Sequence, residues 1–157
     1  MKALLSSLLL LAATAAPVLA DPVLSVISPG AETVELDWKA IEALPQTEVK
    51  TTNDYVEGIH SFSGPLLRDV FGDAKLAPAD QIRLTALNDY AVTIPAADAI
   101  SYSVILATKI DGAKMSVRDK GPIWVIYPMS EHEELRAPGY NDRLIWQLSK
   151  VELVPAK

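Results

Sequence analysis

The stretch that most constrains the fold is residues 115–128, in which a short charged turn leads directly into a continuous run of apolar residues. The run covers residues 123–127, is rich in β-branched and aromatic side chains, and is bracketed by Pro122 and Pro128. Because polar and apolar residues do not alternate in it, both faces of the strand should be covered. The run therefore predicts a central strand buried on both faces, with charged residues 118–120 at the edge of a core.

Residues 1–20 have the pattern of a secretory signal. Lys2 gives a basic start, residues 4–16 are apolar, and the residues that end at Ala20 fit a small-residue cleavage site. The segment is too short and wrongly flanked for a membrane span. We therefore expect cleavage after Ala20, export to the periplasm, and one domain over residues 21–157 that does not insert into the membrane. An uncleaved anchor is the alternative.

The composition excludes several kinds of partner and chemistry. Removing Lys2 lowers the 14 basic residues to 13 and leaves all 20 acidic residues, so the formal charge becomes −7. A negative chain without a basic cluster is a poor partner for nucleic acid or anionic lipid. The sequence contains no cysteine, which excludes disulfides and thiol chemistry.

The rest of the chain predicts many short strands and few helices. Strands are expected over residues 23–27 (at a sheet edge), 33–36, 48–52, 59–63, 81–86, 91–94, 103–108, 114–117 and 145–154. Asp37 can cap a helix over residues 38–43, and Pro65 can begin a second helix that ends at Gly72. Residues 130–140 are expected to form a long polar loop. The pattern predicts a β-rich mixed α+β domain.

Three segments carry a family resemblance: residues 85–90, residues 115–128, and the closing residues 142–148. Together they resemble the molybdopterin-binding domain of the sulfite oxidase family, and in particular its small exported single-domain members in proteobacteria. The likeness spans about residues 36–153. It implies a β-rich mixed, barrel-like sheet fold with a pterin pocket. The family's enzymes hold molybdenum through a cysteine thiolate, which this chain lacks, so the expected ligand is a pterin or molybdopterin-like molecule without metal.

Two groups of polar residues are candidates for contact with the pterin if the chain has this fold. Thr52 and Asn53 leave a strand about where the family's enzymes carry the cysteine, although an ordinary strand end would explain them equally. Asn88, Asp89 and Tyr90 join two apolar strands. A carboxylate and an amide there can match the polar edge of a pterin, and a tyrosine supplies a flat face. An ordinary hairpin turn is the alternative.

The third candidate group lies in and before the closing segment: Arg118, Tyr127, Tyr140, Arg143 and Trp146. The family's enzymes use basic and aromatic residues in the corresponding segment to hold the pterin and its phosphate, and Arg143 and Trp146 match that pattern best. A guanidinium can form two parallel hydrogen bonds or stack on a flat ring. Alternatively, Arg118 pairs with Asp119 at a turn and Trp146 belongs to the core.

The resemblance implies a periplasmic accessory protein. Such proteins bind a reduced pterin and dock on the periplasmic domain of a membrane sensor, such as a histidine kinase or a cyclic-di-GMP enzyme. The expected docking surface is residues 130–140, with Glu131, Glu133 and Glu134. Two alternatives stay open: a molybdopterin-dependent oxidoreductase or its subunit, and a structural adaptor without ligand. No catalytic residue or metal ligand is assigned, so enzyme activity is the less favoured expectation.

Overall fold

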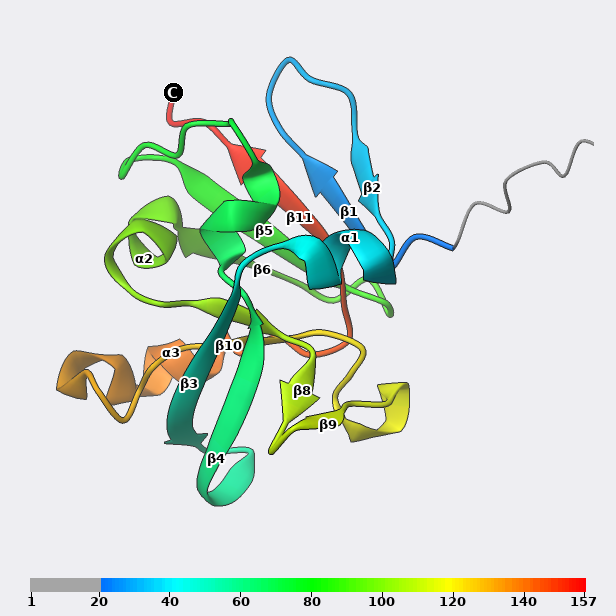
Figure 1. The fold of residues 1–157 in the computed structure, drawn as a ribbon. Helices are drawn as coiled ribbons and strands as arrows, with labels where there is room; N and C mark the ends of the chain where they lie inside the picture. The colour runs from blue at the N-terminus through cyan, green and yellow to red at the C-terminus, as the bar shows by residue number, and fades with distance from the viewer. Residues whose placement is uncertain (1–20) are drawn as a thin grey trace, which may run out of the picture.

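The computed structural model describes residues 21–157. The signal peptide expected over residues 1–20 lies outside the described residues. Figure 1 shows a sheet in the upper half of the molecule and two hairpins below it. None of the helices in the described part is long and apolar enough to cross a membrane.

The upper sheet has five strands in the order β2-β1-β11-β5-β6. Their bounds are β1 (Leu24–Ile27), β2 (Val34–Leu36), β5 (Gln81–Ala86), β6 (Ala91–Pro95) and β11 (Leu148–Val154). Among these five described strands, β1 and β11 pair in parallel, and the other neighbours pair antiparallel. The expectation that residues 23–27 form an edge strand is therefore wrong. Local alternation cannot reveal a pairing with the other end of the chain.

The lower sheet has four strands in the order β3-β4-β8-β9. Their bounds are β3 (Gln46–Asn53), β4 (Val56–Pro65), β8 (Lys109–Ile110) and β9 (Ala113–Lys114). The hairpin β3–β4 is long, its register shifts between Thr51 and Asn53, and its turn is Asp54 and Tyr55. Asp111 and Gly112, a residue pair typical of tight hairpin turns, connect β8 and β9.

Strands β7 (Ile105–Ala107) and β10 (Trp124–Ile126) pair with each other as a two-stranded ribbon between two hydrophobic cores. In β10 and its flanks, Ile123, Val125 and Tyr127 belong to the larger core, whereas Trp124 and Ile126 belong to the smaller one. The prediction of a strand buried on both faces is confirmed. The run has no polar residue because a core lies on each side of it.

The helices are short. They are α1 (Trp38–Ala43), α2 (Ala96–Ser101) and α3 (Pro138–Asn141), with the 3-10 helices η1 (Leu67–Phe71), η2 (Val117–Asp119) and η3 (Glu133–Arg136). The predicted cap of α1 is confirmed, since Asp37 Oδ1 accepts a hydrogen bond from the Ala40 amide at 2.7 Å. Pro65 ends β4 instead of beginning a helix. The described residues thus form the predicted β-rich α+β domain.

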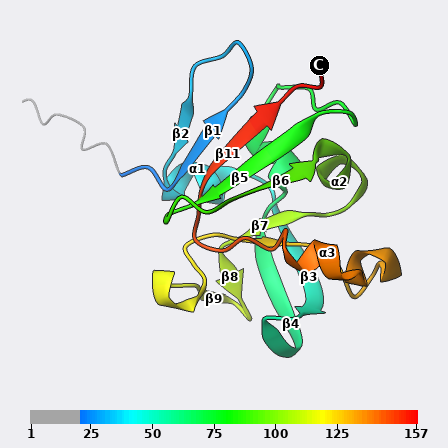
Figure 2. The ribbon, with the colours of Figure 1, turned by 180° about the vertical axis from the view of Figure 1, so that it is seen from behind.

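Residues 130–140 are not the long irregular loop that the sequence predicts. They contain η3 and the start of α3, which lie together beside the lower hairpin in Figure 2. The cause is Leu135, which is fully buried in the larger core and draws the segment onto the molecule. A mostly polar segment with one apolar anchor shows too little periodicity to be recognised as helical.

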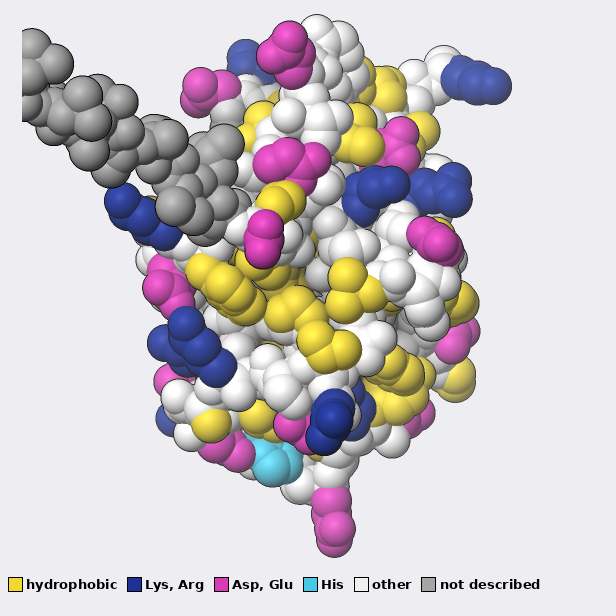
Figure 3. All heavy atoms as spheres, turned by 90° about the vertical axis from the view of Figure 1, so that its right-hand side faces the viewer, with side chains coloured by type: hydrophobic (Ala, Val, Ile, Leu, Met, Phe, Trp, Pro, Cys, Tyr) yellow, Lys and Arg dark blue, Asp and Glu magenta, His cyan; other side chains and the backbone are white. Residues whose placement is uncertain are grey.

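The surface mixes side chains of all types. Figure 3 shows one face on which hydrophobic side chains gather across the middle, while lysines and arginines are scattered among acidic residues. A nucleic acid would require clustered positive charge. The expectation that nucleic acid is not a partner stays a prediction.

Candidate functional site

A cavity of about 230 Å³ lies where three parts of the chain meet: the β3–β4 turn, the β5–β6 turn, and the segment between α3 and β11. We call it the aromatic cavity, because Tyr55, Tyr90 and Trp146 line it. Its other lining residues are Ala86, Asn88, Asn141, Asp142, Leu144, Ile145 and Gln147. The cavity therefore offers flat apolar faces together with amide groups and one carboxylate, which suits a planar ligand with a polar edge.

Two of the aromatic residues are in contact. The rings of Tyr55 and Trp146 meet edge to face, with centroids 5.0 Å apart and an interplanar angle of 76°. Both side chains are still partly open to solvent, with 36% of Tyr55 and 38% of Trp146 exposed. An exposed pair of this kind leaves ring surface that a ligand can cover.

Two carboxylates, those of Asp142 and Asp54, influence the Tyr55 hydroxyl through their negative charge. Burial raises the pKa of its hydroxyl, and the charges of Asp142 and Asp54 raise it further. The hydroxyl donates to the Asn141 carbonyl oxygen at 3.4 Å. Tyr55 is therefore a neutral phenol at physiological pH, and two negative charges lie near its hydroxyl.

A second cavity of about 220 Å³ adjoins the first through Asn141, which lines both. We call it the polar cavity. Its lining residues are Thr52, Asn53, Asp54, Met129, Arg136 and Asn141. Hydroxyl, amide, carboxylate and guanidinium groups are all present in it. It lies about where the resemblance places the family's metal-binding cysteine.

Asn53 has an unused hydrogen-bond donor beside this cavity. Its Oδ1 accepts a hydrogen bond from the Tyr55 amide at 2.9 Å, which fixes the orientation of the side chain. The Nδ2 group on the other side is buried and has no partner among the described residues. A buried donor without an acceptor costs about 1–3 kcal/mol. An acceptor atom of a ligand near Asn53 would remove that cost.

The β5–β6 turn is an ordinary hairpin turn and also lines a cavity, so the two alternatives considered from the sequence are both found in it. Asn88 Oδ1 accepts from the Tyr90 amide at 3.2 Å, and Asp89 has a positive φ of 65°, as expected of a turn. This turn places Asn88 and Tyr90 in the lining of the aromatic cavity. Asp89 lines neither cavity and is exposed.

Arg143 lines neither cavity. Its Nη1 donates to Asp98 Oδ2 at 2.5 Å, and the same oxygen accepts from the Tyr127 hydroxyl at 2.7 Å. The guanidinium also lies over the ring of Tyr140, 4.2 Å from its centroid. Three predicted ligand contacts, Tyr127, Tyr140 and Arg143, therefore belong to a structural network around the buried carboxylate of Asp98.

The pKa values in this network follow from its burial and charge. Burial raises the pKa of Tyr127 well above its usual value, and the charge and hydrogen bond of Asp98 act in the same direction. Burial lowers the pKa of Arg143, but the charge and hydrogen bond of Asp98 outweigh it and raise the pKa overall. At neutral pH the network is therefore a neutral phenol hydrogen-bonded to an ion pair.

Arg118 is exposed on η2 and lines neither cavity. Its helix is joined to the site through Gln147, whose Nε2 donates to the Val117 carbonyl oxygen at 2.8 Å. Of the ten residues predicted from the sequence, the structure brings five to the two cavities: Thr52, Asn53, Asn88, Tyr90 and Trp146.

The sequence analysis missed several lining residues, above all Tyr55, Asn141, Asp142 and Arg136. Tyr55 follows Thr52 and Asn53 in the same turn, so its type and position were a usable signal. Arg136 comes from the segment that was expected to be a loop, and Asn141 directly follows that segment. Only the folding of that segment into η3 and α3 brings them to the site.

The donor groups do not fit a molybdenum centre of the family's type. The chain has no cysteine, and in residues 21–157 no three histidine, cysteine, aspartate or glutamate residues lie close enough to hold a metal ion. The hydroxyls and amides of the polar cavity are hard, neutral donors.

Comparison with known proteins identifies the class. The family model described as oxidoreductase molybdopterin binding domain matches residues 21–131, so the chain belongs to that family. The match ends before α3, and residues 141–147 of the aromatic cavity therefore lie outside it. No curated protein matches the chain by sequence.

The fold is also similar to a solved structure. A chain in the crystal structure of the sulfane dehydrogenase SoxCD from Paracoccus pantotrophus superposes with a TM-score of 0.61 at 11% identity. The alignment covers 83% of this chain but only 37% of that one. At this identity the likeness shows the fold alone, and it confirms the predicted sulfite oxidase-type α+β fold.

Proposed function

We propose that this protein is a pterin-binding accessory protein of the periplasm that reports the presence of its ligand to a membrane sensor. The observation that carries the pterin part is the aromatic cavity, in which Tyr55, Tyr90 and Trp146 surround amide groups on a molybdopterin-domain fold. Asp142 is the carboxylate of the cavity, and a carboxylate can accept two hydrogen bonds from the amino group and ring N–H of a pterin.

Binding can be tested directly with a purified pterin. Neopterin should bind the protein and quench its tryptophan fluorescence, because Trp146 is a wall of the cavity. Trp146→Ala and Tyr55→Ala should each weaken binding about 5- to 150-fold, as expected when one aromatic face that stacks on a base is lost. Isothermal titration calorimetry measures both variants without relying on the fluorescence of the residue removed.

Trp38→Phe is the matched control for this experiment. Trp38 is a partly buried tryptophan on α1, stacked under Lys114, and it lines neither cavity. Its replacement should leave the affinity for neopterin unchanged. Affinities like that of the wild type in both Trp146→Ala and Tyr55→Ala would show that the pterin site lies elsewhere, and absence of binding to the wild type would refute the proposal.

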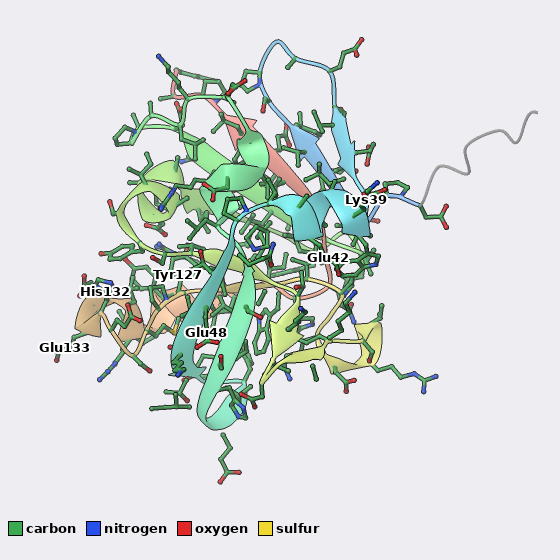
Figure 4. All side chains as sticks on the ribbon, viewed as in Figure 1. Lys39, Glu42, Glu48, Tyr127, His132 and Glu133 are labelled. Carbon is green, nitrogen blue, oxygen red and sulfur yellow. The ribbon has the colours of Figure 1, made fainter. Side chains whose placement is uncertain are left out.

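The signalling part of the proposal depends on the segment that contains η3 and α3. Arg136 of η3 lines the polar cavity and donates to the carbonyl oxygens of Met129 and Ser130, at 2.9 and 3.2 Å. Figure 4 shows His132 and Glu133 at the outer end of this segment. A ligand can influence a partner only by binding one of its states more tightly, so one segment that touches both is a suitable transmitter.

The acidic residues of this segment are not equivalent. Glu134 accepts a hydrogen bond from the Tyr102 hydroxyl at 3.0 Å and lies 3.7 Å from His132 Nδ1. A hydrogen bond with its own backbone lowers the pKa of Glu134, and the bond from Tyr102 lowers it further. Glu131 and Glu133 are exposed. We therefore assign partner docking to Glu131 and Glu133, and assign Glu134 to holding the segment on the domain.

Saturation with neopterin should slow amide hydrogen exchange across residues 130–147, because the ligand would contact both η3 and α3. Exchange in the β1–β2 loop should not change.

In the native host, a photo-crosslinking residue at position 133 should label a membrane sensor from the periplasmic side, more strongly when pterin is present. The same residue in place of the exposed Glu32 is the control.

Two results would contradict this mechanism. Equal labelling from positions 32 and 133 would exclude the segment as the docking surface. Labelling that pterin does not change would leave an accessory protein that is not a ligand sensor. Recovery of the protein outside the periplasmic fraction would refute the proposed location.

The second candidate function is a molybdopterin-dependent oxidoreductase or a subunit of one, and the family match favours it. It would require a metal ligand from outside residues 21–157 or a cofactor held without a protein thiolate. Elemental analysis of protein from its native host separates the candidates. A stoichiometric amount of molybdenum would favour the oxidoreductase.

A further inference from the structure

The charges around the two cavities restrict which ligand can bind. Asp142 lines the aromatic cavity and Asp54 lines the polar cavity. Among residues 21–157, the lining of the aromatic cavity includes no lysine or arginine, and that of the polar cavity includes one, Arg136. Across both cavities, two carboxylates therefore face a single guanidinium.

The guanidinium of Arg136 is itself largely engaged. Its Nε and Nη2 donate to backbone carbonyl oxygens, and those bonds hold the turn before η3 in place. Asp54 lines the same cavity. An anionic group in the polar cavity would meet one positive charge already used in hydrogen bonds and one negative charge.

Cations on neighbouring elements are directed elsewhere. Arg143, the closing-segment residue that most resembled a phosphate ligand, is paired with Asp98. The ammonium of Lys120 lies over the ring of Trp124, 5.4 Å from its centroid. Arg118 lines neither cavity, and the nearby Asp89 adds a further exposed carboxylate.

We propose that the site selects a flat heteroaromatic ring with an uncharged hydrogen-bonding tail, and rejects the same ring when its tail carries a phosphate. The inference deepens the proposed function and rests on it. The ring would occupy the aromatic cavity and the tail would enter the polar cavity past Asn141, where Thr52 and Asn53 offer hydroxyl and amide groups. A tail hydroxyl or carbonyl oxygen is the acceptor that Asn53 Nδ2 lacks. A phosphate would be desolvated beside Asp54 without a compensating pair of cations.

The test compares neopterin, which has a trihydroxypropyl tail, with neopterin monophosphate by calorimetry at pH 7 and low ionic strength. Neopterin should bind at least about tenfold more tightly, because like charges brought together are strongly unfavourable. Raising the ionic strength should reduce the ratio, since salt screens the repulsion. Asp54→Asn should reduce it too, by strengthening the binding of the phosphorylated form. Asp73→Asn, an exposed carboxylate outside both cavities, is the matched control and should leave the ratio unchanged.

The outcomes separate this inference from the proposed function. If neither compound binds, pterin binding itself fails and the inference fails with it. If both bind equally, or the phosphorylated form binds more tightly, pterin binding stands and the inference is overturned. If neopterin monophosphate binds more tightly than neopterin and Lys120→Ala removes that preference, Lys120 is the residue that binds the phosphate. A ratio that Asp54→Asn leaves as in the wild type would also overturn the assignment of the tail to the polar cavity.

Discussion

Replacing Asp98 by alanine should lower the free energy of unfolding by about 3 kcal/mol, the lower end of the range for breaking a buried ion pair. The substitution leaves the fully buried Tyr127 hydroxyl without its acceptor and Arg143 without its counter-ion. We expect the lower end because a quarter of the Arg143 side chain is exposed, so water can replace part of the lost interaction. Urea denaturation followed by circular dichroism measures the change.

Two comparisons make this result specific. Asp69→Ala removes an aspartate whose contact with Arg68 is long, at 3.9 Å, and partly exposed, so it should cost no more than about 1 kcal/mol. The double variant Asp98→Ala with Arg143→Ala should be less destabilised than the sum of the single variants, because each single variant leaves a charge unpaired. If Asp98→Ala costs no more than Asp69→Ala, the network does not stabilise the fold.

The same network explains why Arg143 was assigned to the ligand from the sequence. An arginine beside a tryptophan in a closing segment has the right chemistry for holding an anionic ring. Its actual partner, Asp98, lies on α2 and is 45 residues away in the chain. No local pattern connects the two, because the contact forms only when α2 and the closing segment pack together beside Tyr127.

The fold itself was largely predictable. The continuous apolar run at residues 123–127 indicates burial on both faces, and Asp37 indicates the start of α1. The parallel pairing of β1 with β11 could not be predicted, because it joins the two ends of the domain. Likewise, the polar composition of residues 130–140 hides η3 and α3, whose positions depend on the burial of Leu135.

The site was predictable in its parts but not as an assembly. Thr52, Asn53, Asn88, Tyr90 and Trp146 were selected for residue type at strand ends and turns, and all five line a cavity. The joint between the two cavities is Asn141, whose Oδ1 accepts from the Asp54 amide at 3.3 Å across 87 residues of sequence. Such a long-range contact is a property of the tertiary fold alone.

Replacing Gly64 by alanine should destabilise the domain by at least about 3 kcal/mol, more than overpacking usually costs. Gly64 lies in β4 where this strand passes close to β7. A Cβ atom there would lie 1.9 Å from the Leu106 carbonyl oxygen and 2.7 Å from its carbonyl carbon. Both atoms belong to the backbone, so no side chain can rotate to make room. β4 and β7 would have to separate and disturb the smaller core on either side of Phe62 and Ile105.

Gly139→Ala is the matched control, because the added Cβ has no atom within 4 Å and the backbone of α3 is helical there. It should change the free energy of unfolding by less than about 1 kcal/mol, since alanine is the better helix former. A second comparison tests the cause. Adding Leu106→Ala to Gly64→Ala should not restore stability, because the clash is with the Leu106 carbonyl group and not with its side chain. Recovery in that double variant, or equal stability of Gly64→Ala and Gly139→Ala in thermal melts, would show that the two strands do not approach each other this closely in solution.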